Sequence, residues 1–272
     1  MSEFLSDGVF GKFRDLIYNS SGIHFSESNR TILESRLKER LKKSGLDSVE
    51  AYFDQINSDT EELKGLLDSV TTNLTRFFRN TSHFETFENY VIPDLVKRKQ
   101  AKGDYKFRLW SAGCSTGEEP YSLAMVLKDK LPSNFTIDIT ASDLSLKSLM
   151  TAKEGFYKEA RINGIPDDYL KRFTTQKADG YVINDEIKKM IKFDYHNLKY
   201  DSGLTNLDII FCRNVLIYFD EPAQEAVVNR FYQALDSHSY LFIGHSEPLF
   251  GMNTKFQFLK TDWACIYSKI LD

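Results

Sequence analysis

Hydrophobic residues recur at every third or fourth position through the first 70 residues of the chain. The clearest examples are Phe10, Phe13, Ile17, Leu33, Leu37 and Leu41. This spacing lines one side of a helix with hydrophobic residues and favours their burial in a core. Gly45 predicts the C-terminal end of the helix that carries the three leucines. The pattern therefore predicts a small all-helical domain at the N-terminus.

Two further short helices are predicted from capping signals. Asp47 is followed three residues later by Glu50, and Ser58 is followed three residues later by Glu61. In a capping box, the first side chain accepts a backbone hydrogen bond from the fourth residue, and the fourth side chain bonds back. We therefore expect these two capping boxes to open helices over residues 49–56 and 61–70.

From Tyr105 onward, short hydrophobic runs alternate with helix-like segments. The runs are residues 105–112, 135–142, 207–214 and 239–245, and the helix-like segments are residues 118–131, 145–155 and 222–235. This alternation is typical of a mostly parallel, doubly wound α/β sheet with helices on its faces. Ligands of such sheets bind at the carboxyl ends of the strands.

Two segments interrupt the alternation. Residues 263–270 follow a predicted strand without an intervening helix, so we expect an antiparallel edge strand there. Segments 179–185 and 187–195 predict a small hairpin inserted into the sheet domain. The predicted organisation is a helical domain at residues 1–75, a linker and connecting helix at 76–104, and a sheet domain at 105–272 with an inserted β-subdomain at about 156–195.

Composition narrows the class of protein. The chain has 272 residues, 42% of them hydrophobic, and a net charge of -4, which argues against a general nucleic-acid binder. Hydrophobic runs are too short to cross a bilayer, and we expect a cytoplasmic protein without membrane insertion. The three cysteines form no CxxC pair and the histidines have no ligand-like spacing, so we predict neither disulfide nor metal site.

The strand-to-helix turn Gly113–Gly117 is followed by Glu118 and Glu119. Its spacing matches neither the dinucleotide fingerprint nor a P-loop, which requires a lysine. A helix N-terminus suits a carboxylate, while the two glutamates favour an ammonium or hydroxyl groups over phosphate. S-adenosylmethionine has these groups and no phosphate. The open alternative is that both glutamates only complement the helix dipole.

The next predicted strand ends at Asp143, at the same edge of the sheet. An acid in this place can accept both hydroxyls of a ribose. Alternatively, Asp143 caps the helix that begins near Ser145. Turn and acid together favour a nucleoside ligand.

Five stretches, in order, resemble motifs of the chemotaxis receptor glutamate O-methyltransferases, the CheR family. They are "TTNLTRFFRN", "SAGCSTGEEPYSLAM", "ASDLSLKSLMTAKEGFY", "DIIFCRNVLIYFD" and "LFIGHSE". The resemblance covers nearly the whole chain. It implies a helical domain followed by a Rossmann-like domain that transfers the methyl group of S-adenosylmethionine to receptor glutamates. The products are glutamate methyl esters and S-adenosylhomocysteine, and the partner is the cytoplasmic helical domain of chemoreceptors; we expect a monomer.

The resemblance also implies roles for individual residues. It assigns cofactor contacts to Asn73, Thr75, Arg79, Glu118, Asp143, Asn197, Leu198, Cys212 and Arg213. Glu118 and Asp143 hold the amino acid and ribose parts, and Asn197 with Leu198 contacts the adenine region. We further expect Arg79 to orient the carboxylate or the cofactor, and Tyr218 to line the path of the methyl group.

Taken alone, several of these residues have structural interpretations. Cys212 and Tyr218 are typical of core positions, as are Phe77 and Phe78. Arg79 and Arg213 are equally compatible with surface ion pairs.

The resemblance has one departure. In the family, the inserted β-subdomain can dock a C-terminal receptor pentapeptide. Here the segment 172–183 is short and lacks the glycine-rich loop of the members that do so. We therefore do not expect pentapeptide docking.

The leucine-bearing helix has a basic face formed by Arg36, Arg40 and Lys43. Arg36 and Arg40 are four residues apart and repel each other, a cost that an acidic partner offsets. We predict that Arg36 and Arg40 dock the glutamate-rich substrate helix. The open alternative is a solvated face in which Glu39 pairs with Lys43.

Two other functions stay open from the residues alone. A methyltransferase acting on nucleic acid or a small molecule would keep the cofactor site. The segment "RNVLIYF" replaces the Asn-Pro-Pro-aromatic motif of amino-directed DNA methylases, which argues against DNA. A binding module that senses a nucleoside without catalysis is the second alternative.

Overall fold

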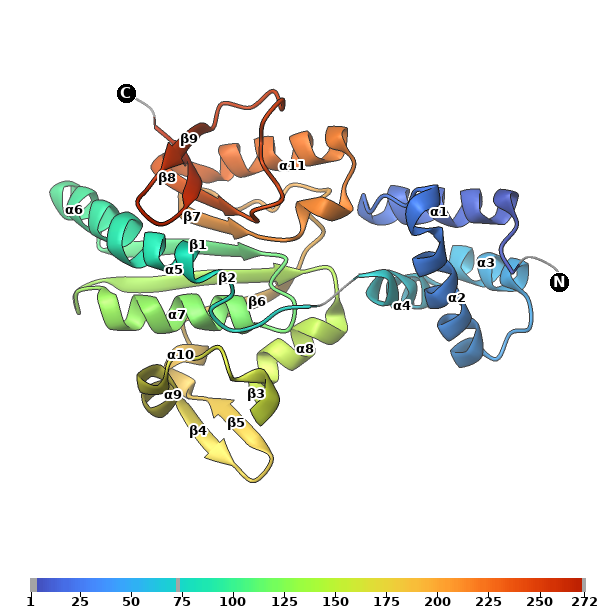
Figure 1. Cartoon of the computed structure of the whole chain (residues 1–272), viewed down its shortest axis with the longest axis horizontal. Coiled ribbons are helices and arrows are strands. Elements are labelled where there is room, and N and C mark those ends of the chain that lie inside the picture. The colour runs from blue at the N-terminus through green and yellow to red at the C-terminus, as the bar shows by residue number, and fades with distance from the viewer. Residues whose placement is uncertain (1–3, 72–73, 271–272) are drawn as a thin grey trace. The chain divides into compact units, whose positions relative to one another are not determined.

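The computed structural model describes residues 4–71 and 74–270. The chain divides into two compact units (Figure 1). The first comprises Met1–Thr72 with Tyr218–Gln224, and the second comprises Asn73–Ile217 with Glu225–Asp272. The chain thus returns to the first unit for one short segment.

The first unit is helical. Its elements are α1 (Asp7–Ser21), η1 (Glu27–Asn29), α2 (Arg30–Ser44), α3 (Val49–Ser58) and α4 (Thr60–Val70). The hydrophobic stripes predicted from spacing are buried on α1 and α2, which confirms the core assignment. Gly45 ends α2 with φ of +70°, a conformation that glycine adopts without steric cost.

Both predicted caps lie one residue too early. Ser48 caps α3 by accepting the Ala51 N–H at 3.0 Å, and Asp59 caps α4 by accepting the N–H groups of Glu61 and Glu62. Each helix is preceded by two adjacent capping residues. The second residue of each pair is the one in extended conformation just before the first helical turn, so it makes the bond.

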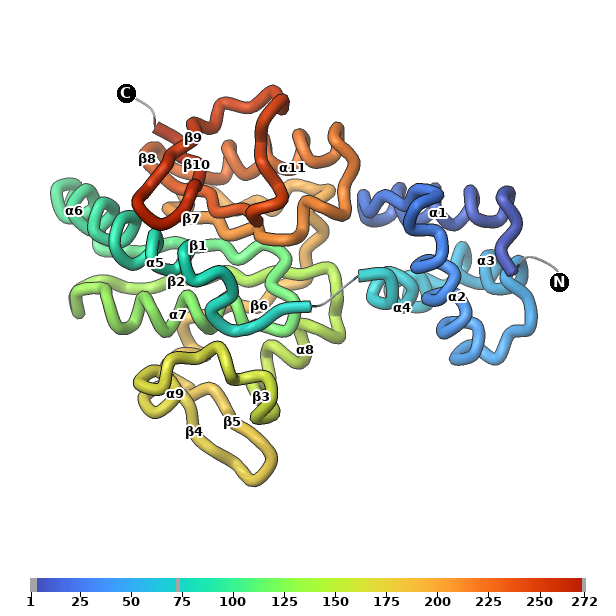
Figure 2. Tube along the Cα trace, viewed as in Figure 1, coloured from blue at the N-terminus to red at the C-terminus, as the bar shows by residue number. Residues whose placement is uncertain are grey.

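The second unit is built on a seven-stranded sheet of order β6-β2-β1-β7-β8-β10-β9. The strands are β1 (Lys106–Ala112), β2 (Thr136–Asp143), β6 (Ile191–Tyr195), β7 (Leu207–Cys212), β8 (Leu235–Ile243), β9 (Gln257–Lys260) and β10 (Cys265–Lys269). The first five in spatial order are parallel, and β10 is antiparallel to β8 and β9. From β1 the chain continues to β2 on one side, and later to β7 on the other, as the trace in Figure 2 shows. The strand order therefore reverses between β1 and β7, which is where doubly wound sheets bind ligands.

Helices cover both faces of this sheet. They are α5 (Thr81–Thr86), η2 (Phe87–Val91), α6 (Ile92–Lys102), α7 (Glu118–Lys130), α8 (Leu146–Glu154) and α11 (Glu221–Ala234). Phe87 packs edge-on against Phe211 of β7 on one face, with ring centroids 5.4 Å apart. Phe231 of α11 packs against Trp110 of β1 on the other face, at 5.3 Å. The predicted doubly wound, Rossmann-like architecture is confirmed.

The inserted β-subdomain is a separate three-stranded antiparallel sheet of order β3-β5-β4. It comprises β3 (Phe156–Lys158), η3 (Glu159–Arg161), α9 (Asp167–Phe173), β4 (Thr174–Lys177) and β5 (Gly180–Ile183), followed by α10 (Asp185–Lys188). The predicted hairpin of segments 179–185 and 187–195 is wrong, because β5 pairs with β4 and β6 joins β2 in the main sheet. A two-residue loop before Gly180 closes the β4–β5 hairpin.

The expected edge strand at residues 263–270 is also misplaced. The strand there, β10, is antiparallel as predicted, but it lies between β8 and β9, so β9 forms the edge. The sequence of β9, "QFLK", is too short to show a strand pattern by itself.

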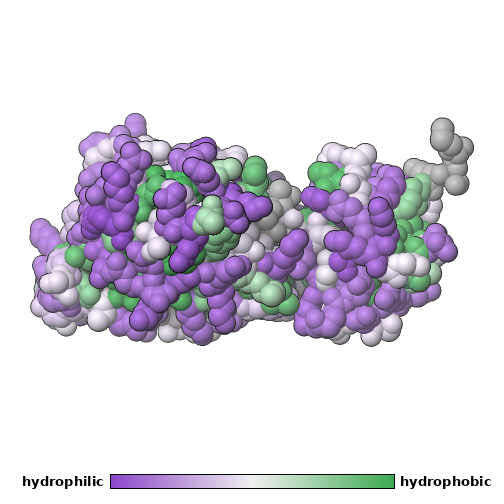
Figure 3. Space-filling view, turned by 90° about the horizontal axis from the view of Figure 1, so that it is seen from below, coloured by the Kyte–Doolittle hydropathy of each residue, from purple (hydrophilic) through white to green (hydrophobic). Residues whose placement is uncertain are grey.

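The face in Figure 3 is mostly hydrophilic, with small hydrophobic patches. Within residues 4–71 and 74–270, no helix combines the length and the hydrophobicity needed to cross a bilayer.

Candidate functional site

The turn after β1 is the best-defined feature at the strand reversal. Gly113 and Gly117 have φ of +82° and +95°, and Ser115 also has a positive φ. The N–H groups of Gly113 and Cys114 both donate to the Ser142 carbonyl, at 2.8 and 2.9 Å. The turn is therefore fixed to the carboxyl end of β2, and α7 begins directly after it.

Replacing Gly117 by Ala is expected to lower the free energy of unfolding by about 2 to 3 kcal/mol. An added Cβ would lie 2.8 Å from the Cβ of Ala152 and 2.9 Å from the Tyr157 hydroxyl, in a backbone conformation that L-residues rarely adopt. Gly103→Ala is the matched control, since Gly103 has φ of +69° but open space around it. Urea unfolding measures both variants, and equal losses would contradict a steric role for the turn.

Asp143 ends β2 and is held by two backbone N–H groups. Its Oδ2 accepts the Ser115 N–H at 2.7 Å, and its Oδ1 accepts the Ser145 N–H at 2.8 Å. The cap of α8 is Ser145, which accepts the Ser148 N–H, so the alternative that Asp143 is this cap is wrong. The carboxylate is buried and joins the turn to the end of β2.

Glu118, the first residue of α7, is completely buried. Its carboxylate accepts the Thr116 hydroxyl at 2.7 Å and forms an ion pair with Arg161. Arg161 also donates to the Thr116 hydroxyl, at 2.7 Å. Sequence reasoning missed Arg161, which is brought to the turn from η3 in the inserted subdomain by tertiary structure alone.

Glu119 and Arg213 form a buried ion pair across the strand reversal. Arg213 follows β7, and its Nε donates to Glu119 Oε2 at 2.7 Å. Glu119 Oε1 accepts the Ser111 hydroxyl at 2.7 Å. Nη1 of Arg213 donates to the carbonyl of Arg79 at 2.5 Å. This network connects the linker, β1, α7 and β7. The alternative that Arg213 forms a surface ion pair is wrong, because the pair with Glu119 is buried.

His83 of α5 is buried and contacts this network at Arg213. Its Nδ1 is 3.5 Å from Arg213 Nη1, and its ring is 4.6 Å from the ring of His245. Burial, with smaller contributions from Arg213 and His245, lowers the pKa of His83 to about 3. The ring is therefore neutral at physiological pH, which suits its place beside a cation. The sequence contains no signal that singles out His83 among the five histidines.

Both thiols near the turn are inert. Cys114 and Cys212 are fully buried, and burial raises the pKa of each thiol well above its ordinary value. Neither is a thiolate at neutral pH, so neither supplies a nucleophile. The prediction of a small buried side chain at Cys212 is confirmed.

The linker residues have mixed placements. Asn73 lies outside the described residues. Arg79 is half-buried, and its guanidinium donates to the Leu74 carbonyl at 2.9 Å. Phe77 is buried, as predicted for a core residue. Thr75 lines a cavity described below.

Asn197 and Leu198 follow β6 at the same edge of the sheet. The N–H of His196 donates to the Asp143 carbonyl at 3.1 Å, which fixes this segment beside β2. Asn197 Oδ1 accepts the Lys199 N–H at 2.9 Å, and Leu198 is buried. The structure thus brings Asn197, Leu198 and Asp143 together.

Three predicted site residues belong to the helical unit. The Tyr218 carbonyl accepts the His24 N–H at 2.8 Å, and its side chain is half-buried. Arg40 forms an ion pair with Glu62 at 2.5 Å, so its charge is neutralised within the unit. Arg36 forms a longer ion pair with Glu39, at 3.7 Å. Of the two arginines predicted to dock the substrate, Arg36 is therefore less tightly paired within the unit than Arg40.

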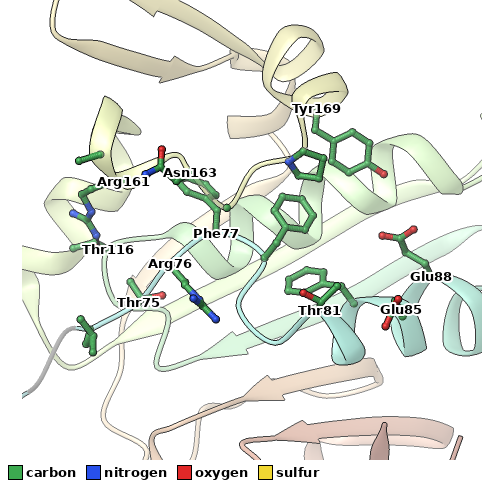
Figure 4. A pocket seen from close by; sticks show the side chains of 16 residues that line it. Thr75, Arg76, Phe77, Thr81, Glu85, Glu88, Thr116, Arg161, Asn163 and Tyr169 are labelled. Carbon is green, nitrogen blue, oxygen red and sulfur yellow. Dashed lines mark hydrogen bonds between the residues drawn. The ribbon is translucent and has the colours of Figure 1, made fainter. Parts of the chain in front are cut away.

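A cavity of about 960 Å³ lies beside the turn (Figure 4). Its lining comes from the linker, α5 and η2, the turn, and residues 160–169 of the inserted subdomain. Two smaller cavities lie elsewhere, around Lys99 and around Lys269. The described residues contain no cluster of three or more side chains suited to hold a metal ion.

The groups at the strand reversal fit a nucleoside cofactor without phosphate. Glu118, Glu119 and Asp143 are buried carboxylates, and the turn contains no lysine. Carboxylates accept hydrogen bonds from hydroxyl and ammonium groups, and the two arginines nearby are already paired with Glu118 and Glu119. Asp143, in contrast, accepts backbone N–H groups.

Comparison with known proteins supports the same cofactor. Two family models match in order: the all-alpha domain of CheR methyltransferase over residues 9–71, and its SAM binding domain over residues 73–265. A chemotaxis protein methyltransferase of Borreliella burgdorferi is 38% identical over 245 residues, covering 87% of this chain and 86% of the relative. The chemotaxis protein methyltransferase of Escherichia coli (strain K12) is 35% identical over 263 residues, covering 93% and 88%. The resemblance seen in the motifs is thereby confirmed, and the chain belongs to the CheR methyltransferase family, with an S-adenosylmethionine-binding domain after its helical domain.

Proposed function

We propose that this chain is a cytoplasmic protein-glutamate O-methyltransferase that modifies chemotaxis receptors. It transfers the methyl group of S-adenosylmethionine to glutamate side chains and forms methyl esters. The strongest support is that both CheR domain models match in order, over residues 9–71 and 73–265. Relatives named for chemotaxis protein methyltransferase activity align along most of the chain.

The proposed cofactor residues lie at the carboxyl ends of β1, β2, β6 and β7 and in the linker. Asp143 accepts the ribose hydroxyls, Asn197 and Leu198 border the adenine, and the region of Glu118 holds the amino acid part. Thr75 and Arg79 close the site from the linker. Arg213 has a positioning role: its ion pair with Glu119 holds the guanidinium in place, and the guanidinium donates to the Arg79 carbonyl and so fixes the Arg79 backbone. Cys212 contributes a buried wall and no reactive group.

The chemistry requires alignment more than activation. A glutamate has a solution pKa near 4.3, so its carboxylate is already a nucleophile at neutral pH and needs no general base. The bound cofactor supplies an electrophilic methyl group on a sulfonium. Holding a nucleophile in attack geometry lowers a barrier by up to about 7 to 11 kcal/mol in favourable systems. We assign orientation of the carboxylate to Arg79 and the methyl path to Tyr218.

The helical domain is proposed to dock the receptor. Arg36 is the favoured contact, because Arg40 is paired with Glu62 in this structure. A receptor carboxylate must displace Glu62 before it can bind Arg40. Docking of a receptor pentapeptide is not part of the proposal. The enzyme is proposed to act as a monomer.

A methyl-transfer assay tests this function. Purified protein is incubated with methyl-tritiated S-adenosylmethionine and membranes that contain chemoreceptors. Base-labile release of radioactive methanol from the receptor band identifies methyl esters. If the protein binds the cofactor but the labelled methyl group is found on nucleic acid or a small molecule, the substrate is a different one. If the protein binds the cofactor and transfers no methyl group, it is a nucleoside-sensing module.

Asp143→Ala is expected to weaken binding of S-adenosylmethionine and of S-adenosylhomocysteine by about 1 to 3 kcal/mol, because hydrogen bonds to buried ligand hydroxyls are lost. Calorimetric titration measures both affinities. Asp138→Ala is the control, since Asp138 lies on the same strand but is exposed and pairs with Lys106. Parent affinity in a folded Asp143→Ala variant would remove Asp143 from the site.

A further inference from the structure

The cavity beside the turn is an open groove with walls from three parts of the chain (Figure 4). Linker residues Leu74–Phe78 form one wall, α5 and η2 form the second, and residues 160–169 form the third. At about 960 Å³ it is at the upper end of the range of small-molecule pockets. Of its lining residues, only Thr75 has a role in the proposed function, as a cofactor contact.

The walls are fixed in place. The Phe78 N–H donates to the Ser122 hydroxyl of α7 at 3.0 Å, and Phe77 packs edge-on against Tyr157 at 4.9 Å. Gly164 passes so close to the linker that a Cβ would lie 2.2 Å from the Phe77 carbonyl oxygen. The groove is therefore preformed, and a ligand need not order it.

Opposite charges mark the two ends of the groove. Arg76 and Arg161 lie toward one end, and Glu85 and Glu88 lie toward the other, as Figure 4 shows. Two of these charges are already engaged, because Arg161 pairs with Glu118 and Glu88 lies 3.5 Å from Lys130.

The other two charges face solvent. Arg76 and Glu85 are exposed and form no ion pair with any residue in the described part of the chain. Phe77, Phe78 and Tyr169 also line the groove, and their aromatic rings add an apolar surface to it. Leu74, which also lines the groove, is 78% exposed.

We propose that this groove binds a segment of the protein substrate, with an acidic side chain at Arg76 and a basic side chain at Glu85. The proposal rests on the proposed function, since it names a specificity site for the same substrate. Charge complementarity selects the occupant: a segment with both charges pairs with both ends, and its apolar residues cover the aromatic floor. Thr75, a proposed cofactor contact, lines the groove, and the linker continues from it to Arg79, so the bound segment flanks the glutamate that is methylated.

Steady-state methylation of chemoreceptor membranes by the full chain tests the proposal. Arg76→Glu and Glu85→Lys are each expected to raise the apparent Michaelis constant for receptor about tenfold, since each variant repels its partner charge. Arg76→Lys should stay close to the parent. Lys153→Glu, which makes the same charge change on the exposed side of α8, should leave the constant unchanged. Affinity for S-adenosylmethionine should be the same in all variants.

The outcomes separate the alternatives. Parent kinetics in both Arg76→Glu and Glu85→Lys overturn the groove proposal and leave the proposed function standing. A fall in S-adenosylmethionine affinity in either variant also overturns it, because the groove then belongs to the cofactor site. If the parent protein methylates no receptor, the proposed function fails and the groove proposal fails with it.

Discussion

Replacing Arg213 by Met is expected to lower the free energy of unfolding by about 3 to 5 kcal/mol. The substitution keeps much of the side-chain volume, but among residues 4–71 and 74–270 it leaves the buried carboxylate of Glu119 with the Ser111 hydroxyl as its one partner. It also removes the donor to the Arg79 carbonyl, which should loosen the linker. Urea unfolding followed by circular dichroism measures the loss.

The double variant Arg213→Met with Glu119→Gln separates charge from packing. Because the second substitution removes the unpaired buried charge, the double variant should be more stable than Arg213→Met alone. Arg172→Met is the control, since its ion pair with Asp129 is solvent-exposed. A loss below about 1 kcal/mol for Arg213→Met would show that the pair behaves as a surface ion pair.

The alternation of strands and helices could be predicted because each element carries its own signal. Strand β7 and the later residues of β1 and β8 are buried on both faces, so these runs are mostly hydrophobic in the sequence, whereas β2 alternates polar and hydrophobic residues over its first half. The spacing of leucines on α2 was an equally direct signal. Local patterns of this kind report what a segment buries, and they gave the architecture.

Which strand pairs with which was harder to predict from the sequence. The hydrophobic pattern of residues 191–195 indicates a strand but does not tell whether it joins β5 or β2. Register and partner depend on the two-residue loop before Gly180 and on α10, which separates β5 from β6. Strand β9 is so short that its place at the edge is set by pairing with β10 alone.

Residues of the site that follow a strand were easier to identify than their partners. Asp143 could be selected because it ends a strand at a predictable edge of the sheet. Arg161 and His83 come from other elements, and only tertiary structure brings them to Glu118 and Arg213. The two glutamates of the turn were assigned to ligand binding or to the helix dipole, but each is paired with an arginine, an outcome that neither interpretation included.

Acidification is expected to destabilise the protein through His83 as the pH falls from about 6.5 toward 3. Its folded-state pKa is about 3, while an unfolded histidine has a pKa near 6.5. Between these values the unfolded chain binds a proton that the folded protein does not, so the stability contributed by neutral His83 is complete above pH 6.5 and is lost below it. For this group alone the loss is about 2 kcal/mol at pH 5 relative to neutral pH.

His83→Asn removes the titrating group while keeping a polar side chain beside Arg213. The variant should therefore show a shallower fall in the free energy of unfolding between pH 7 and pH 5, whatever its stability at neutral pH. His238→Asn is the control, because it removes a histidine far from Arg213 in sequence, at a backbone φ of +57° that asparagine tolerates. Urea unfolding at a series of pH values gives the slopes. Identical slopes for His83→Asn and the parent would mean that the acid sensitivity comes from other groups, and that the buried ring accepts a proton more readily than its contact with Arg213 implies.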